Sequence, residues 1–334
     1  MTLLRNYCLI KMAKILVSIV ILTKNGEMYL DEVLKSVFAQ NVNFGYEVLT
    51  VDSGSCDRTL EIINKYNTRL VRINASEFNH GATRNLGARL AKGEYVVYLS
   101  QDATPGNEKW LSELVGPFAD KRVAGVYSRH SPREDCNPVL QKMMTKVWPT
   151  GLSRDLMVVP ADLKRYEDNL SKIIHFSDSS SAIRRKVLLE IPFFDTMFAE
   201  DMQWEIEALG AGYKVFYNSK SVIRHSHDYS LVEQVRQNYD HERAVSHIFR
   251  GRRGKGGIVW RLFNPFRIVW IVWSDFKYIF FKYKCDLPSK LGWMAYSPLW
   301  HLAVFGGTFL GGISDLLPEI VRNNLSRQRR IKNR

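Results

Sequence analysis

The stretch at residues 95–105, YVVYLSQDATP, decides how the rest of the chain is interpreted. It is an apolar run of strand-forming residues that ends abruptly in Ser100, Gln101 and Asp102. Ligands of open α/β sheets bind beyond the carboxyl ends of the strands. An acid at this point therefore marks a place where a metal ion or a nucleotide phosphate would be held.

The composition is that of a globular protein. The 334 residues, 46% of them hydrophobic, suffice for one large α/β domain or two smaller ones. The four cysteines lie far apart without a CxxC pair, so neither a zinc site nor a disulfide framework is expected, and reduced thiols indicate the cytoplasm. Residues 1–14 contain Lys11 and Lys14 and precede no small-residue cleavage site, so a secretory signal is not expected.

Outward from residues 95–105, apolar β-branched runs alternate with segments of helical spacing, which predicts an α/β fold with right-handed βαβ units. The predicted strands are 15–22, 47–51, 70–73, 95–100, 123–127 and 213–218. The predicted helices are 28–40, 60–66, 83–91, 109–118, 139–148, 202–209 and 230–249.

The second predicted strand ends in Asp52, which is followed by Ser53, Gly54 and Ser55. Because this acid lies at the carboxyl end of a strand, we expect it to accept hydrogen bonds from a base or a ribose. Ser55 or Asp57 would in addition cap the helix that follows.

Four motifs occur in order along the chain. A strand ends in Thr23-Lys24-Asn25, and VDSGSCDRT, His80-Gly81-Ala82-x-Arg84-Asn85-x-Gly87 and YLSQDATP follow. Together they resemble the inverting family 2 glycosyltransferases of GT-A fold, most of all the bacterial rhamnosyltransferases that build O-antigen and related surface polysaccharides. The resemblance runs from about residue 16 to residue 227.

It implies a Rossmann-like, mostly parallel central sheet and a nucleotide-sugar donor. The residues that it assigns to the donor are Thr23, Asn25, Asp52, Ser53, Gly54, Ser55, His80, Arg84, Asn85, Ser100, Gln101 and Ser179.

Stabilising a nucleoside diphosphate as it leaves requires a divalent cation or an arginine clamp. Asp102 would bind Mg²⁺ or Mn²⁺, but the D-x-D motif common in the family has lost its first acid to Ser100. A distant histidine would complete the metal shell, with His225 preferred to His227. Arg84 is expected early in the helix at 83–91, facing phosphate, or as a surface residue bridging to Asp52 or Glu94.

Inverting transfer requires a carboxylate that removes the proton of the acceptor hydroxyl. The resemblance implies an acidic pair at the start of a helix, which Glu200 and Asp201 match. We expect Asp201 to be the base and Glu200 to be the alternative, since neighbouring helical residues point in different directions. Two acids in a first turn would also complement the helix dipole in any protein.

The C-terminal part carries ten of the thirteen net positive charges, with 18 Lys/Arg against 8 Asp/Glu from residue 226 onward, and five of the eight tryptophans. This mixture favours an anionic membrane surface over nucleic acid.

GRRGKGG at 251–257 is the candidate boundary. Residues 258–283, interrupted by charges, predict a helix lying in the interface, and the uncharged residues 291–314 predict a shallow hairpin or a docked helical pair, because Pro298 and glycine pairs interrupt them.

We therefore predict a glycosyltransferase domain at residues 13–228 and a membrane-associating helical tail at 229–334, on the cytoplasmic face of the bacterial inner membrane. By resemblance the donor is dTDP-L-rhamnose and the acceptor a polyprenyl-diphosphate oligosaccharide. The alternatives are another donor, UDP-hexose or GDP-mannose, and a non-catalytic nucleotide-sugar-binding scaffold.

Overall fold

The structure, a computed structural model, describes residues 15–146, 155–167, 170–196, 198–249 and 265–327. The chain forms two compact units, and each is described by itself. The first contains the residues up to His130 together with 152–164 and 174–225. The second contains residues 131–151, 165–173 and 226–334. GRRGKGG lies outside the described residues.

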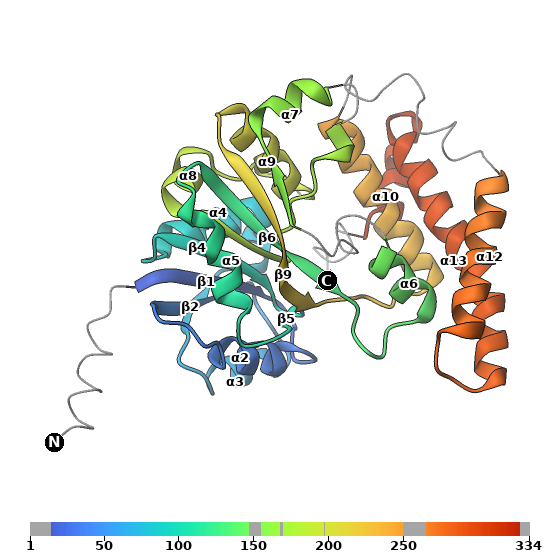
Figure 1. Ribbon diagram of the computed structural model, residues 1–334, viewed down its shortest axis with the longest axis horizontal. Coiled ribbons are helices and arrows are strands. Elements are labelled where there is room, and N and C mark those ends of the chain that lie inside the picture. The colour runs from blue at the N-terminus through green and yellow to red at the C-terminus, as the bar shows by residue number, and fades with distance from the viewer. Residues whose placement is uncertain (1–14, 147–154, 168–169, 197, 250–264, 328–334) are drawn as a thin grey trace. The chain divides into compact units, whose positions relative to one another are not determined.

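The first unit is built on a mixed sheet (Figure 1), whose strands run in the order β3-β2-β1-β4-β8-β6-β9-β5, with β7 paired to β9. The four strands β3, β2, β1 and β4 are parallel to one another. By contrast, β8 is antiparallel to both β4 and β6, and β9 is antiparallel to both β5 and β7. The strands are β1 (Ile15–Thr23), β2 (Gly45–Asp52), β3 (Arg69–Arg72), β4 (Tyr95–Ser100), β5 (Thr104–Pro105), β6 (Val123–Ser131), β7 (Leu156–Val158), β8 (Ser180–Arg184) and β9 (Lys214–Arg224).

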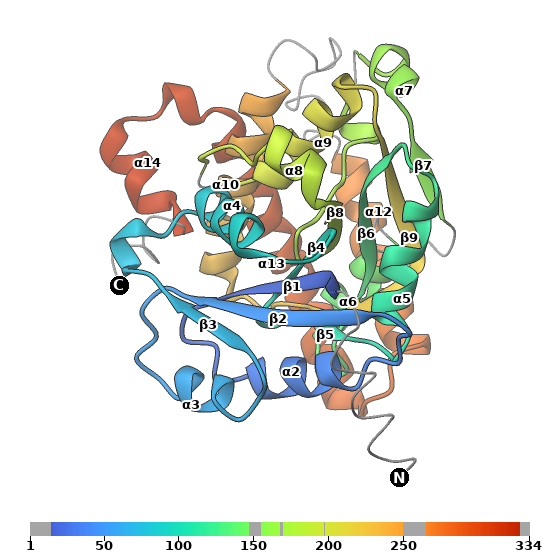
Figure 2. The ribbon, with the colours of Figure 1, turned by 90° about the vertical axis from the view of Figure 1, so that its left-hand side faces the viewer.

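Helices cover both faces of the sheet (Figure 2). The odd-numbered β1 residues Val17, Ile19 and Ile21 share one core with apolar residues of α2, α3 and α5. Val20 points to the opposite face, where it packs against Gly87 of α4. The helices are α2 (Leu30–Phe38), α3 (Thr59–Ile63), α4 (His80–Leu90), α5 (Trp110–Val115), α7 (Pro160–Arg165), α8 (Arg185–Glu190) and α9 (Glu200–Gly210), with 3-10 turns at Ala75–Glu77 and Gly116–Ala119.

Three differences from the predicted elements of the first unit bear on the site. The sheet is mixed and not mostly parallel, because only the first four strands in its order come from βαβ crossovers. The helix predicted at 83–91 begins at His80, since Asn79 caps it by accepting a hydrogen bond from the Ala82 N–H. The strand predicted at 213–218 continues to Arg224, which brings it next to β5.

The second unit is helical, with α6 (Pro138–Lys146), α10 (Leu231–Ile248), α12 (Pro265–Phe281), α13 (Leu287–Gly312), α14 (Glu319–Leu325) and 3-10 turns at Leu170–Lys172 and Ser314–Leu316. The interruption predicted within 291–314, as a shallow hairpin or a docked helical pair, is wrong, because α13 is one helix that contains Pro298. Two of its glycines serve packing and not turning. A Cβ at Gly307 would lie 2.3 Å from the Val235 carbonyl oxygen, and one at Gly311 would lie 2.6 Å from that of Tyr239. Among the described residues, no helix is both long and apolar enough to cross a membrane.

Candidate functional site

Asp52 organises the loops at the carboxyl ends of β1 and β2. One of its carboxylate oxygens accepts hydrogen bonds from the Gly54 and Ser55 N–H groups, each at 3.0 Å. The other accepts from the hydroxyl groups of Thr23 at 3.0 Å and Ser55 at 2.5 Å. The Asp52 side chain is fully buried. It therefore holds the loop in shape, and direct contact with a base or ribose would require some of these bonds to be exchanged.

Asn25 and Ser53 complete this loop cluster. The Asn25 N–H donates to the Ser55 hydroxyl at 2.9 Å, and the Asn25 side chain accepts from the Cys56 N–H at 2.8 Å. The Ser53 N–H donates to the Thr23 carbonyl oxygen at 3.0 Å. Asn25 has a φ of 48°, in the left-handed region that asparagine tolerates better than most residues. The structure thus brings together all six residues that the sequence assigned to this part of the donor site.

Gln101 joins the end of β4 to the end of β1. Its side-chain oxygen accepts from the Lys24 N–H, and its amide donates to the Lys24 carbonyl oxygen, each at 3.0 Å. This two-bond link leaves no room beside it, since a Cβ on Gly26 would lie 2.4 Å from the Gln101 oxygen. The Ser100 N–H donates to the Ser179 carbonyl oxygen at 3.0 Å, so the two serines are neighbours.

Asp102 and His225 lie side by side. The His225 Nε2 is 3.3 Å from the Asp102 Oδ1, and both side chains are partly exposed. A carboxylate oxygen and an imidazole nitrogen are both donors that divalent ions accept in proteins, so this pair fits a cation that holds water or substrate at its other positions. His227 belongs to the second unit, where its ring stacks on Tyr229.

The His80 to Asn85 motif docks α4 on the loop that precedes α9. The Asn85 side chain donates to the Phe193 carbonyl oxygen at 2.8 Å and accepts from the Phe193 N–H at 3.0 Å. A Cβ on Gly81 would lie 1.9 Å from the Phe194 carbonyl oxygen, so only glycine permits this approach. His80 packs edge-on against Phe78. The contacts of Asn85 and Gly81 therefore explain the motif as a connection that holds α4 against the loop at 193–196.

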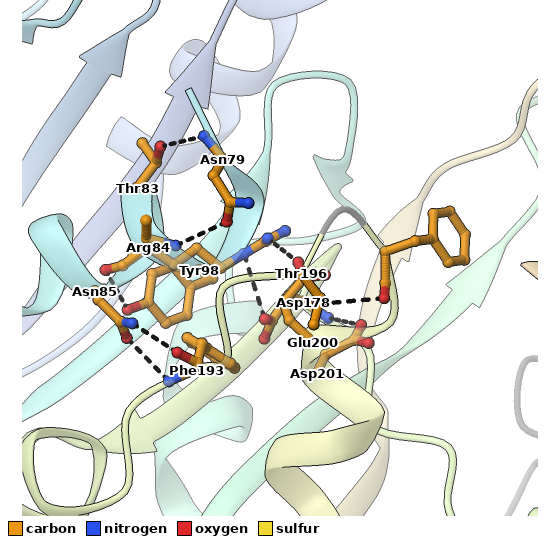
Figure 3. A network of polar contacts seen from close by, with 12 residues as sticks. Asn79, Thr83, Arg84, Asn85, Tyr98, Asp178, Phe193, Thr196, Glu200 and Asp201 are labelled. Carbon is orange, nitrogen blue, oxygen red and sulfur yellow. Dashed lines mark hydrogen bonds and ion pairs between the residues drawn. The ribbon is translucent and has the colours of Figure 1, made fainter. Parts of the chain in front are cut away.

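Arg84 lies at the centre of a buried acidic cluster (Figure 3). Its guanidinium forms ion pairs with Glu200 and, at 3.3 Å, with Asp178. All three side chains are at most 12% exposed. Asp201 belongs to the same cluster, because its Oδ2 accepts from the Asp178 N–H at 3.2 Å. Arg84 therefore lies in the second turn of α4 and binds two acids, neither of which is the Asp52 or Glu94 considered from the sequence.

The charges in this cluster shift one another's protonation. Burial raises the pKa of Asp201 above its ordinary value, Glu200 raises it further, and Arg84 opposes both. Burial also raises the pKa of Asp178, against the opposing effect of Arg84. Burial alone would lower the pKa of Arg84, but Glu200 and Asp178 outweigh it and the pKa rises. The cluster thus contains one firmly charged cation and two aspartates, Asp178 and Asp201, that protonate more readily than exposed ones.

The backbone at the start of α9 is strained. Ala199, the residue before Glu200, has a φ of 62°, which places a non-glycine residue in the left-handed region. Such a conformation costs roughly 1–2 kcal/mol and persists only where surrounding contacts impose it. Here it directs Glu200 towards Arg84. Asp201 turns to the Asp178 N–H instead.

Residues 18–191, more than half of the chain, match the family described as Glycosyl transferase family 2. The chain belongs to this family. Among its relatives, the O-antigen chain rhamnosyltransferase WbaN of Salmonella anatum is 34% identical over 207 residues, which are 61% of this chain and 64% of WbaN. The O-antigen chain rhamnosyltransferase RfbN of Salmonella typhimurium is 30% identical over 228 residues, 67% of this chain and 70% of RfbN.

Solved structures show the same fold. The mannosyltransferase PcManGT from Pyrobaculum calidifontis, in complex with GDP-Man and Mn²⁺, has a TM-score of 0.56 at 16% identity and covers 95% of each chain. Residues 1–349 of S. aureus TarS have a TM-score of 0.50 at 16% identity, covering 90% of this chain and 91% of that one. At such identities the likeness concerns the fold alone, and it confirms the expected α/β fold of GT-A type.

For this family 2 glycosyltransferase, the sequence did not single out Asp178. The residue directly precedes Ser179, which the resemblance assigned to the donor, yet no role was predicted for Asp178 itself. Its side chain is buried, and the Ser181 hydroxyl donates to it at 2.6 Å. A lone acid within a run of small polar residues just before a strand was the available signal. Its partner Arg84, 94 positions earlier, could be found only in three dimensions.

Proposed function

We propose that this family 2 glycosyltransferase transfers L-rhamnose from dTDP-L-rhamnose to a hydroxyl group of a lipid-linked oligosaccharide, with inversion at the anomeric carbon. The names of the relatives WbaN and RfbN, both O-antigen chain rhamnosyltransferases, support the donor and the polysaccharide. We assign residues 13–228 to donor binding and chemistry. Residues 229–334 are assigned to association with the cytoplasmic face of the bacterial inner membrane, where a polyprenyl-diphosphate-linked acceptor would be met.

The proposed chemistry rests on the different surroundings of the Glu200 and Asp201 carboxylates. Glu200 is bound to the Arg84 guanidinium, which keeps its carboxylate engaged. Asp201 accepts hydrogen bonds from the Asp178 and Met202 N–H groups, and burial raises its pKa. A carboxylate with a raised pKa is a stronger base than an ordinary one, so we assign proton abstraction to Asp201.

In the proposed step, the acceptor hydroxyl oxygen attacks the anomeric carbon from the side opposite the diphosphate. Its proton passes to Asp201, and the bond from the anomeric carbon to the diphosphate oxygen breaks, so the electron pair leaves with the diphosphate. Attack from the opposite side inverts the configuration. The loops around Asp52 and Gln101 would hold the nucleotide.

Asp102 and His225 would hold a divalent cation, Mg²⁺ or Mn²⁺. When bound, the cation neutralises negative charge on the leaving diphosphate. The complex of PcManGT with Mn²⁺ supports this assignment by analogy of fold.

The test is nucleoside diphosphate release by the full chain from dTDP-L-rhamnose, UDP-glucose and GDP-mannose, with and without Mg²⁺ or Mn²⁺. We expect release from dTDP-L-rhamnose to depend on an acceptor. Asp201→Asn is expected to lower the rate by at least about a hundredfold, which is the usual contribution of a positioned general base. Exposed Asp195→Asn, on the loop before α9, is the matched control.

Release from another donor alone would replace rhamnose by that sugar. Release from none of them would favour the non-catalytic scaffold, and unchanged release by Asp201→Asn would remove Asp201 as the base. Loss of activity in Glu200→Gln with retention in Asp201→Asn would transfer the role to Glu200.

A further inference from the structure

Helix α12 of the second unit directs aromatic side chains outward. Trp270, Trp273 and Phe281 are 68%, 57% and 77% exposed. Their spacing along the helix aligns them on one face, together with the exposed residues Val269 and Phe280. A helix of a water-soluble protein normally presents the opposite pattern, with its polar face outward.

The single acidic residue of α12 points inward. Asp275 is 3% exposed and forms an ion pair with Lys142 of α6. Its other carboxylate oxygen lies 2.7 Å from both the Ser297 hydroxyl and the His301 Nε2, on α13. Three groups from α6 and α13 thus surround the Asp275 carboxylate, and their hydrogen bonds hold its pKa low against the burial that would raise it.

This buried network determines how α12 is rotated. Turning the helix to bury its tryptophans would expose Asp275 and leave the buried Lys142 without its partner, which is strongly destabilising. Ile279, on the same side as Asp275, is fully buried in the core of this unit. The outward aromatic face is therefore imposed by the packing of the second unit.

Basic side chains lie among the outward aromatic ones. The Lys277 ammonium lies over the Trp273 ring, 5.4 Å from its centroid. The Lys290 ammonium lies 5.6 Å from the centroid of Phe280 and donates to its carbonyl oxygen at 2.8 Å. Lys282, just beyond α12, is exposed. The face thus combines amphipathic aromatic rings with cations and contains no acid of α12.

We infer that this face of α12, formed by Val269, Trp270, Trp273, Lys277, Phe280 and Phe281, docks on an anionic phospholipid surface. The rings would enter the boundary between headgroups and acyl chains, and Lys277 and Lys282 would contact lipid phosphates. A second copy of the chain is a poorer partner, because two such faces would bring like charges together. Nucleic acid would leave the apolar rings against a polar groove. The inference rests on the membrane association proposed above and is independent of the proposed sugar chemistry.

The experiment is flotation of the full chain with vesicles of phosphatidylglycerol and phosphatidylethanolamine, and with vesicles of phosphatidylcholine alone. The double variant Trp270→Ser/Trp273→Ser is expected to lower partitioning at least about tenfold, roughly 1.4 kcal/mol. Val232→Ser is the control, since Val232 is a similarly exposed apolar residue of α10 in the same unit. Lys277→Glu/Lys282→Glu should weaken binding to the anionic vesicles and leave binding to the phosphatidylcholine vesicles unchanged. The difference between this variant and the wild type should disappear at high salt, which screens the charges.

Partitioning of the tryptophan double variant equal to that of the wild type would overturn the inference. So would a wild-type dimer in light scattering that becomes monomeric in the same variant, because the face would then be an interface between copies. Circular dichroism on each variant excludes unfolding as the cause of lost binding. Flotation requires no donor, so a chain that binds vesicles but releases no nucleotide refutes the proposed chemistry alone. A chain that is active on a soluble acceptor but remains unbound refutes the docking face alone.

Discussion

The link between Asn85 and Phe193 holds α4 to the loop before α9, and its removal offers a direct test of the site. In Asn85→Ala, the Phe193 N–H and C=O lose the partners at 3.0 and 2.8 Å. Phe193 is 3% exposed, so water cannot fully replace the lost amide. A buried main-chain group left unpaired costs roughly 1–3 kcal/mol. With partial hydration of the new space, we expect the free energy of unfolding to fall by about 2–4 kcal/mol.

The assay is urea unfolding of the full chain, followed by fluorescence, with the slope m compared between variants. Asn43→Ala, at an exposed position between α2 and β2, is the control and should change stability by less than about 0.5 kcal/mol. Asn85→Asp keeps the acceptor for the Phe193 N–H but sets a carboxylate oxygen against the Phe193 carbonyl oxygen, so it should also destabilise.

The loop at 193–196 leads to Ala199 and then to Asp201, so we expect the turnover of Asn85→Ala to fall about tenfold or more under conditions in which the variant remains folded. A free energy of unfolding within about 0.5 kcal/mol of the wild type would refute the claim that the Asn85 hydrogen bonds hold α4 to this loop. A destabilised variant with unchanged turnover would show that these hydrogen bonds stabilise the fold without positioning Asp201.

Three further outcomes are expected. Asp201 must be ionised to accept a proton and its pKa is raised, so kcat/KM should fall with decreasing pH at an apparent pKa above the ordinary aspartate value of about 3.9. Glu200→Gln should move this acidic limb of the pH profile to lower pH, because Glu200 raises the pKa of Asp201. A limb that does not move would contradict the coupling between Glu200 and Asp201. Chelation of divalent ions should abolish nucleotide release, and Asp102→Ala and His225→Ala should each lower it and raise the Mn²⁺ concentration needed, whereas unchanged turnover of His225→Ala would exclude the shared cation. Gln101→Ala removes both bonds to Lys24 and should raise the donor KM several-fold with a smaller change in kcat, as isothermal titration with nucleoside diphosphate would verify.

Much of the first unit follows from local patterns in the sequence. The β-branched run of β1 and the apolar spacing of α2 specify a strand and a helix without reference to the remaining chain. Asp52 was identified because ligands of open α/β sheets bind beyond the carboxyl ends of the strands, and the family resemblance assigned the residues around it to the donor. Periodicity, however, could not tell that β8 returns antiparallel to β4, since strand direction depends on the connection and not on the strand.

Other features needed the tertiary structure because they join distant residues. The glycines of α13 were interpreted as interruptions, yet Gly307 and Gly311 allow the backbone of α10 to approach closely. A glycine that turns the chain and a glycine that admits a neighbour are identical in sequence. Only the packing of the second unit distinguishes them.

Asp102, at the end of YVVYLSQDATP, illustrates the division. Its type and its place at the end of a buried strand were determined by the sequence, because they depend on neighbouring residues alone. Its proximity to His225, 3.3 Å away across 123 positions, and the pairing of Arg84 with Glu200 and Asp178 were decided by the tertiary structure. Electrostatic partners are selected by distance in space, and a single sequence records only distance along the chain.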